Sequence, residues 1–73
     1  MKTKDHLALF GRNVKTIRKE KGLSQEELAS KAGVHRTYVG MIERGEKNIT
    51  LTNILKLSGA LKVSPSSLLE NVK

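Results

Sequence analysis

Signals that end or start a helix recur along this chain at short intervals, so every regular element must be short. They fall at Gly22, Gly33, Gly45 and Ser64-Pro65. Glycine often ends a helix because it adopts a left-handed backbone without strain, and serine followed by proline is typical of a helix start. None of the five resulting segments shows the apolar alternation of a strand. The sequence predicts an all-α fold, a compact five-helix bundle forming one domain over residues 1–73.

The spacing of apolar residues inside the segments is helical. Residues 5–21 place an apolar residue at every third or fourth position, and Gly22 ends this stripe. Ser24 and Glu27 form a capping box, so we expect Ser24 to cap a helix that runs to about Ala32. The other helices are expected over residues 34 or 35 to 44, from a Thr50 cap onward, and over residues 65 to about 71.

The second and third segments have the spacing of a helix-turn-helix. This motif crosses two short helices at about 90–120° through a turn of three or four residues. Ala29 is small enough for the close crossing, and Gly33 provides the backbone that the turn requires. At 100° per residue, the outward arc of the following helix holds Arg36, Thr37, Gly40, Met41 and Arg44. Arg36 and Thr37 lie near the start of that helix, where recognition helices contact base edges.

Charge favours a nucleic-acid partner, because 14 Lys and Arg residues against 7 Asp and Glu give a net charge of +7. The histidines, His6 and His35, lack the spacing of a metal site, and no phosphate loop or nucleophile–base arrangement is present. We therefore expect no enzyme, no metal and no cofactor. Leu7–Phe10 is too short for a signal peptide, and no apolar run approaches the length of a membrane span. The expected location is the cytoplasm, without membrane contact.

A family resemblance rests on the residues around the predicted turn. The stretch Leu23–Gly45, LSQEELASKAGVHRTYVGMIERG, resembles the helix-turn-helix of the phage-repressor and Cro-like family, and the resemblance covers roughly residues 7–70. The run HRTYVGMIERGEKNIT, followed by a leucine-rich helix, is most similar to the controller proteins of restriction–modification systems. The resemblance implies a dimeric, sequence-specific transcription regulator of its own gene and the endonuclease gene. Double-stranded DNA and a second copy are the implied partners, and RNA polymerase stays open as another.

The resemblance also implies roles for individual residues. Arg36 and Thr37 match the positions that read bases, and arginine is the commonest reader of guanine. The positions that match contacts to the DNA backbone are Gln25, His35, Tyr38, Arg44, Lys47 and Asn48. Gly40 and Met41 depart from better-known phage members, which carry longer polar readers there. A close approach of DNA and a tolerated surface glycine are both open as explanations of Gly40.

One pair of charges is marked by position as well as by the family. Arg18 falls inside the apolar stripe of the first helix, and Glu43 borders the inner side of the third. We expect a partly buried ion pair that fixes the third helix on the first, a pairing that the family also carries. The alternative is two unrelated charges that reach water along their apolar stems.

The C-terminal segment is expected to form the interface of a symmetric dimer. Pro65, Leu68, Leu69 and Val72 lie on one side of a two-turn helix, and Leu55 adds to the apolar rim of the fourth. By family alignment Leu68 faces the partner and Leu69 enters the core; alternatively, all of these residues close the monomer core. One short helix reads too few base pairs for a genome-scale search, so a near-palindromic operator with half-sites about 34–36 Å apart is predicted.

Three other binding functions compete with this interpretation. An RNA reader would stack bases on aromatic side chains, and the chain has only Phe10 and Tyr38. An antitoxin would need a toxin-binding segment, for which only residues 71–73 remain. A membrane-surface helix would use the first helix, whose apolar stripe the core needs. Among DNA-binding regulators, a phage-type repressor or a DNA-binding antitoxin remains the alternative to a controller protein.

Overall fold

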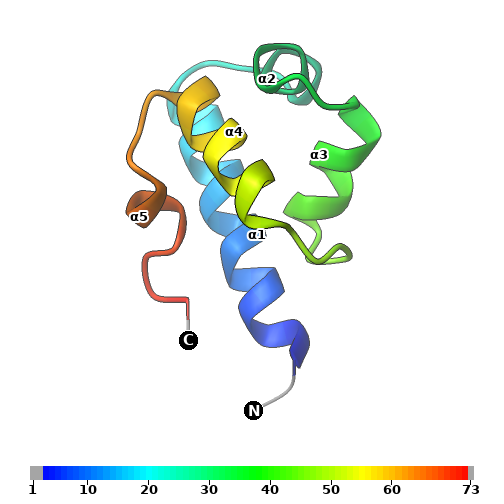
Figure 1. Ribbon diagram of the computed structural model, residues 1–73, viewed down its shortest axis with the longest axis vertical. Coiled ribbons are helices and arrows are strands. Elements are labelled where there is room, and N and C mark those ends of the chain that lie inside the picture. Colours follow the sequence, from blue (N-terminus) through cyan, green and yellow to red (C-terminus); the bar gives the residue numbers. More distant parts are fainter. Residues whose placement is uncertain (1–2, 73) are drawn as a thin grey trace.

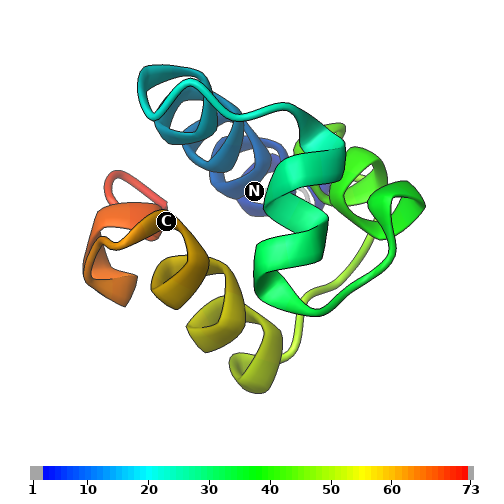
Figure 2. The same ribbon diagram turned by 90° about the horizontal axis from the view of Figure 1, so that it is seen from above.

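The computed structural model describes residues 3–72, with side chains from His6 onward. Within that range the chain forms helices only: α1 (Thr3–Glu20), α2 (Gln25–Ala32), α3 (Arg36–Glu43), α4 (Leu51–Leu61) and α5 (Pro65–Leu68). The predicted all-α fold is confirmed. The long helix α1 runs through the length of the molecule, with α3 and α5 on opposite sides of it and α4 across its front (Figure 1). Seen from above, α2 lies between α3 and α4 (Figure 2).

Local capping signals set where the helices begin and end. Ser24 Oγ accepts from the Glu27 N–H at 3.0 Å, and Glu27 Oε1 accepts from the Ser24 N–H at 2.8 Å, which is the predicted capping box. The bond from the Ser24 backbone holds the pKa of Glu27 below its ordinary value. Thr50 Oγ1 accepts from the Asn53 N–H at 3.1 Å and caps α4 as expected. The predicted stops are confirmed at Gly22, Gly33 and Gly45, all with φ of 72°.

The core is aliphatic apart from one phenylalanine, as a chain so poor in aromatic residues requires. Every helix contributes to it, and its buried members are Phe10, Val14, Leu28, Ala29, Ala32, Val39, Ile42, Leu57, Leu61 and Leu68. Ala29 is only 3% exposed, and the Val34 N–H donates to its carbonyl at 3.0 Å. A small side chain at Ala29 thus allows α2 and the turn into α3 to pack closely. No helix in residues 3–72 is long and apolar enough to cross a membrane.

The backbones of α1 and α3 touch at Gly11. This glycine lies in the middle of α1 and is buried. A Cβ built on it would lie 2.7 Å from the carbonyl oxygen of Glu43 and nearer still to that of Ile42. No side chain fits in this space, so Gly11 sets how closely α3 approaches α1. The sequence alone did not predict this role, because a glycine within a helical stripe carries no mark of what packs against it.

The C-terminal end corrects two predictions. Helix α5 ends at Leu68 rather than near Asn71, whose φ is 65°. Leu68 is fully buried and Leu69 is 43% exposed, so the assignment of Leu68 to the partner and Leu69 to the core is wrong. The physical reason is the docking of α5 on α1. Asn13 Nδ2 donates to the carbonyls of Leu68 and Glu70 at 2.9 and 2.8 Å, which fixes the end of α5 against α1 with Leu68 inward.

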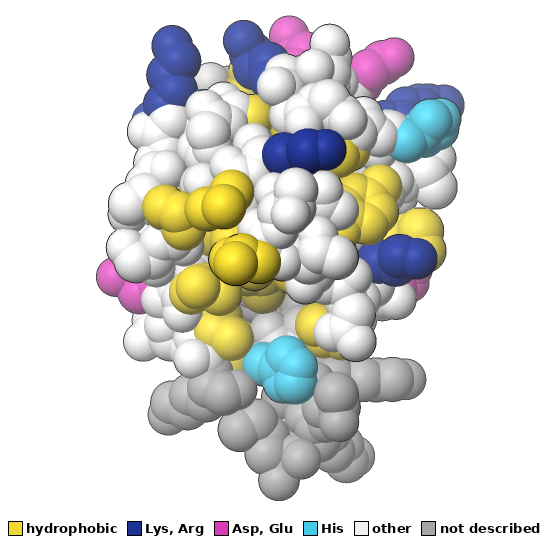
Figure 3. Space-filling model, in the orientation of Figure 1, with side chains coloured by type: hydrophobic (Ala, Val, Ile, Leu, Met, Phe, Trp, Pro, Cys, Tyr) yellow, Lys and Arg dark blue, Asp and Glu magenta, His cyan; other side chains and the backbone are white. Residues whose placement is uncertain are grey.

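Three large apolar side chains are exposed among residues 6–72. Leu51 is 71% exposed, Leu55 is 51% exposed and Leu69 is 43% exposed, while Pro65 is half-buried. Figure 3 shows hydrophobic side chains gathered on the face that carries α4 and α5, with most Lys and Arg side chains toward its edges. We call the exposed side chains of Leu51 and Leu55 on α4, together with that of Leu69 directly after α5, the apolar face.

Candidate nucleic-acid interface

A buried ion pair holds α3 on α1. Arg18 Nε donates to Glu43 Oε2 at 2.6 Å and Arg18 Nη2 donates to Glu43 Oε1 at 3.0 Å, so the pair is bidentate. The side chains of Arg18 and Glu43 are only 9% and 3% exposed. Arg18 Nη1 also donates to the carbonyl of Leu23 at 2.8 Å. The ion pair expected from the sequence is therefore present, and it also ties the α1–α2 turn to α1.

The same carboxylate also reaches α2. Gln25 Nε2 donates to Glu43 Oε1 at 2.9 Å, so Glu43 contacts side chains from both α1 and α2. A hydrogen-bonded charge in a protected site is directional and strong. Glu43 consequently sets the orientation of the Gln25 amide next to the outward arc of α3.

A hollow on the surface brings four of the expected DNA-contacting residues together. It is lined by Gln25 from α2 and by Arg36, Thr37, Gly40 and Arg44 from the outward arc of α3 and the residue after it. Arg36 and Thr37 are exposed, and neither belongs to the hydrophobic core. The predicted outward arc therefore does face solvent, with two guanidinium groups around one concave surface.

His35 forms the start of α3. Its Nδ1 accepts from the Thr37 N–H at 3.1 Å, so a neutral ring carries its proton on Nε2. The cap uses the imidazole instead of the more usual hydroxyl or carboxylate. The first turn of α3 contains no acidic residue, so no carboxylate of α3 itself offsets the partial positive charge of this helix end beside Arg36. This end of the helix is suited to an anionic partner.

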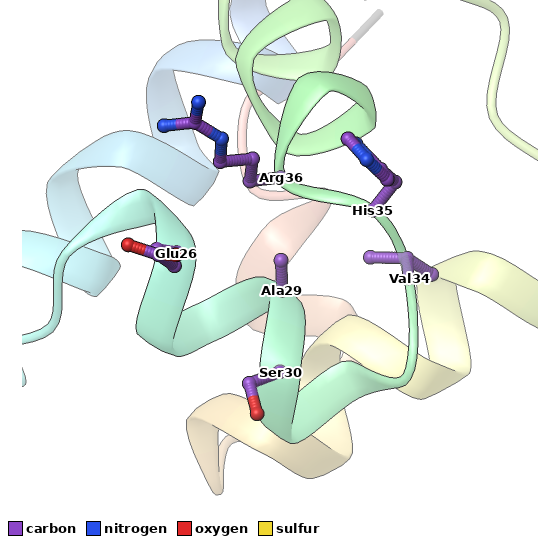
Figure 4. A pocket seen from close by; sticks show the side chains of 6 residues that line it. All are labelled: Glu26, Ala29, Ser30, Val34, His35 and Arg36. Carbon is purple, nitrogen blue, oxygen red and sulfur yellow. The ribbon is translucent and has the colours of Figure 1, made fainter.

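A second groove lies next to the hollow, on the other side of Arg36. It runs between α2, which contributes Glu26, Ala29 and Ser30, and the start of α3 with the turn before it, which contribute Val34, His35 and Arg36 (Figure 4). Its lining is mixed, with apolar, hydroxyl and oppositely charged side chains. Arg36 lines both concave surfaces, so it stands on the ridge between them.

Tyr38 and the loop residues lie outside the hollow. The ring of Tyr38 packs against the core, and its hydroxyl accepts from Asn53 Nδ2 at 2.9 Å, which links α3 to α4. Its own hydroxyl proton is left for another acceptor. Lys47 and Asn48 are exposed in the loop after α3, and Asn48 lines a separate apolar hollow beside His6. The role of Asn53 was not predicted, because nothing near it in sequence distinguishes it from other polar residues of an exposed helix turn.

These groups are suited to binding a partner that accepts hydrogen bonds. The hollow offers guanidinium, amide and hydroxyl groups that donate hydrogen bonds to an anion or to a base edge. In the part of the chain that the structure describes, no group of three or more His, Asp or Glu residues is placed to hold a metal ion. The exposed side of α3 therefore presents hydrogen-bond donors and two guanidinium groups around one hollow.

Comparison with known proteins gives consistent matches over most of the chain. The helix-turn-helix family model matches residues 14–68. Control protein C.BamHI of Bacillus amyloliquefaciens is 51% identical over 63 residues, which cover 85% of this chain and 78% of that protein. Control protein C.SmaI of Serratia marcescens is 44% identical over 61 residues, covering 84% and 73%. The restriction–modification controller protein C.AhdI from Aeromonas hydrophila superposes with a TM-score of 0.84 at 50% identity, covering 85% of this chain and 94% of that one.

Proposed function

The chain belongs to the helix-turn-helix family and is a DNA-binding transcription regulator, and we propose that it is the controller protein of a restriction–modification system. The observation that carries this proposal is the exposed hollow on α3, where Arg36, Thr37 and Arg44 converge, in a chain 51% identical to a control protein. We further propose that it acts in the cytoplasm, by binding rather than by catalysis.

The proposed mechanism places α3 in the major groove. Arg36 then pairs with the O6 and N7 atoms of a guanine, and Thr37 contacts a neighbouring base. The backbone contacts assigned to Gln25, His35, Tyr38, Lys47 and Asn48 fix the register without reading sequence. The Arg18–Glu43–Gln25 network and the Tyr38–Asn53 bond hold α3 before DNA arrives. Less ordering is then needed on binding, which favours affinity.

We propose a two-fold dimer formed through the apolar face. The monomer exposes three large apolar side chains to water, those of Leu51, Leu55 and Leu69. Exposed apolar side chains that form one patch are typical of a protein–protein interface. The hollow lined by Phe10, Ile54, Leu69 and Val72 opens beside this face and would receive side chains of a second copy. A dimer presents two α3 helices about one turn of DNA apart, so the operator is expected to be a near-palindrome with that half-site spacing.

The controller function is tested on the DNA upstream of the chain's own gene. We expect footprinting to reveal a near-palindromic site there and upstream of a neighbouring endonuclease gene. Transcription from those promoters with purified RNA polymerase, the further partner that we propose, should change when the protein is added. A site found only at phage-type operators, or binding only together with a toxin, would support the alternative function instead.

Arg36→Ala should lower affinity for the specific site by about 1–3 kcal/mol while barely changing affinity for random duplex. Its exposed place at the start of α3, away from the packed network, is the reason. Lys47→Ala is the matched control, because a loop lysine supplies charge alone. It should weaken both kinds of binding alike and flatten the slope of log K against log salt by about 0.9 for each phosphate that the lysine no longer neutralises. Titrations at several salt concentrations measure both, and equal reductions for Arg36→Ala on the two duplexes would make it a phosphate contact.

Leu69→Glu should convert the dimer to a folded monomer and weaken operator binding about tenfold or more. The substitution places like charges near each other across the two-fold axis, whereas an exposed Leu69 adds little to the fold of one monomer. Leu69→Met keeps the apolar volume and should stay dimeric. Sedimentation measures the oligomeric state, and a Leu69→Glu dimer of normal affinity would move the interface elsewhere.

A further inference from the structure

Arg44 lies back over α3 rather than out toward the following loop. A Cβ built on Gly40 would lie 3.2 Å from Arg44 Nη1 and 3.9 Å from Arg44 Cζ. Gly40 is buried for this reason, although it stands in the outward arc. Long side chains on a helix cover the turn that precedes their own Cα, so this placement needs no unusual backbone. It brings the guanidinium into the hollow that Arg36, Thr37 and Gln25 line.

Glu46 holds the other edge of that guanidinium. Arg44 Nε and Glu46 Oε2 are 3.0 Å apart, and both side chains are more than half exposed. Among residues 6–72, whose side chains the structure describes, none is hydrogen-bonded to Arg44 Nη1 or Nη2, so the forked end is open to a partner from outside that part of the chain. The carboxylate also repels a DNA phosphate that would approach the Nε edge. A base edge is neutral and meets no such repulsion.

We infer that Arg44 is a second base reader, that its Nη1 and Nη2 pair with the O6 and N7 atoms of a guanine, and that Gly40 and Glu46 position it. This assigns Arg44 to sequence readout instead of to the DNA backbone, and it rests on the proposed docking of α3 in the major groove. It also gives Gly40 a physical role. Without a Cβ at Gly40, Arg44 Nη1 lies over the helix only 3.2 Å from the place where that Cβ would stand, and Gln25 Oε1 lies 3.6 Å from the same place, so an added methyl group would push the guanidinium outward.

The test compares Arg44→Ala with Arg44→Lys on an operator selected from random duplexes with the unmodified protein. A base reader needs the planar fork, so both variants should lose about tenfold or more on the operator while keeping their affinity for random duplex. Guanine preference at one position of each half-site should relax. Rescue by lysine, or equal reductions on both duplexes with a flatter salt slope, would overturn the inference and return Arg44 to the role of binding a phosphate.

Two positioning variants separate this inference from the proposed function. Gly40→Ala should keep the fold, since alanine favours a helix, yet lower the ratio of operator to random-duplex affinity by displacing Arg44. Glu46→Gln should raise affinity for random duplex and lower the same ratio. If Arg36→Ala lowers the ratio and the Arg44 and Gly40 variants do not, only this inference fails. If none of these variants lowers it, α3 is not the reading element and the proposed function fails as well.

Discussion

Glu43→Ala is expected to destabilise the folded chain by about 3–5 kcal/mol, close to the whole free energy of unfolding of a domain this small. The carboxylate is 3% exposed and accepts from Arg18 Nε, Arg18 Nη2 and Gln25 Nε2. Its removal leaves the Arg18 guanidinium, itself 9% exposed, in the protein without a counter-charge. Urea unfolding followed by circular dichroism measures the loss of stability.

Three further variants make the result interpretable. Glu43→Gln keeps the volume and one of the two acceptor oxygens, so it should lose less stability than the alanine variant and remain measurable if that variant does not fold. The double variant Arg18→Ala with Glu43→Ala should lose less than the sum of the two single changes, because they interrupt one interaction. Glu46→Ala breaks the exposed pair with Arg44 and should change stability by less than about 1 kcal/mol. Simple additivity of the Arg18→Ala and Glu43→Ala effects would show that these two residues do not stabilise each other.

The sequence alone predicted a structural feature correctly where the residues that determine it lie within a few positions of one another. The capping box of Ser24 and Glu27, the Thr50 cap and the terminating glycines all lie next to the ends that they specify. The Arg18–Glu43 pair was also predictable, although its partners are 25 residues apart, because Arg18 interrupts an apolar stripe, Glu43 borders another, and the resembling family carries the same pairing. Such a charge requires a partner when it is buried.

Prediction failed where a long-range contact chooses between neighbouring residues. Leu68 and Leu69 are equally apolar, and local sequence does not say which of them turns inward. The choice depends on the hydrogen bonds that Asn13 donates to the carbonyls of Leu68 and Glu70, which lie 55 and 57 residues away in sequence. The Tyr38–Asn53 bond is likewise set by how α3 and α4 pack. Gly40 was left open for a related reason, since only the position of Arg44 shows what occupies the space above it.

Gly11→Ala is expected to destabilise the fold by at least about 3 kcal/mol, although alanine is intrinsically the better helix former by about 1 kcal/mol. The added methyl group would meet the carbonyl oxygens of Ile42 and Glu43, which are backbone atoms at the end of α3 and cannot rotate aside. Helices α1 and α3 would have to separate, which stretches the Arg18–Glu43 pair as well. The recognition helix would then lose both its packing and its ion pair.

Gly59→Ala is the matched control for this prediction. Gly59 lies in helix α4, is exposed, and has no atom within 4 Å of the place where a Cβ would stand. The same change there should stabilise the chain by up to about 1 kcal/mol, because only helix propensity acts. Opposite signs for the two glycines in urea unfolding would show that backbone contact at Gly11, rather than helix propensity, sets the spacing of α1 and α3. A Gly11→Ala variant as stable as the unmodified chain would show that α3 can shift on α1, and the rigid docking that orients Arg36 and Thr37 would have to come from α2 and α4 alone.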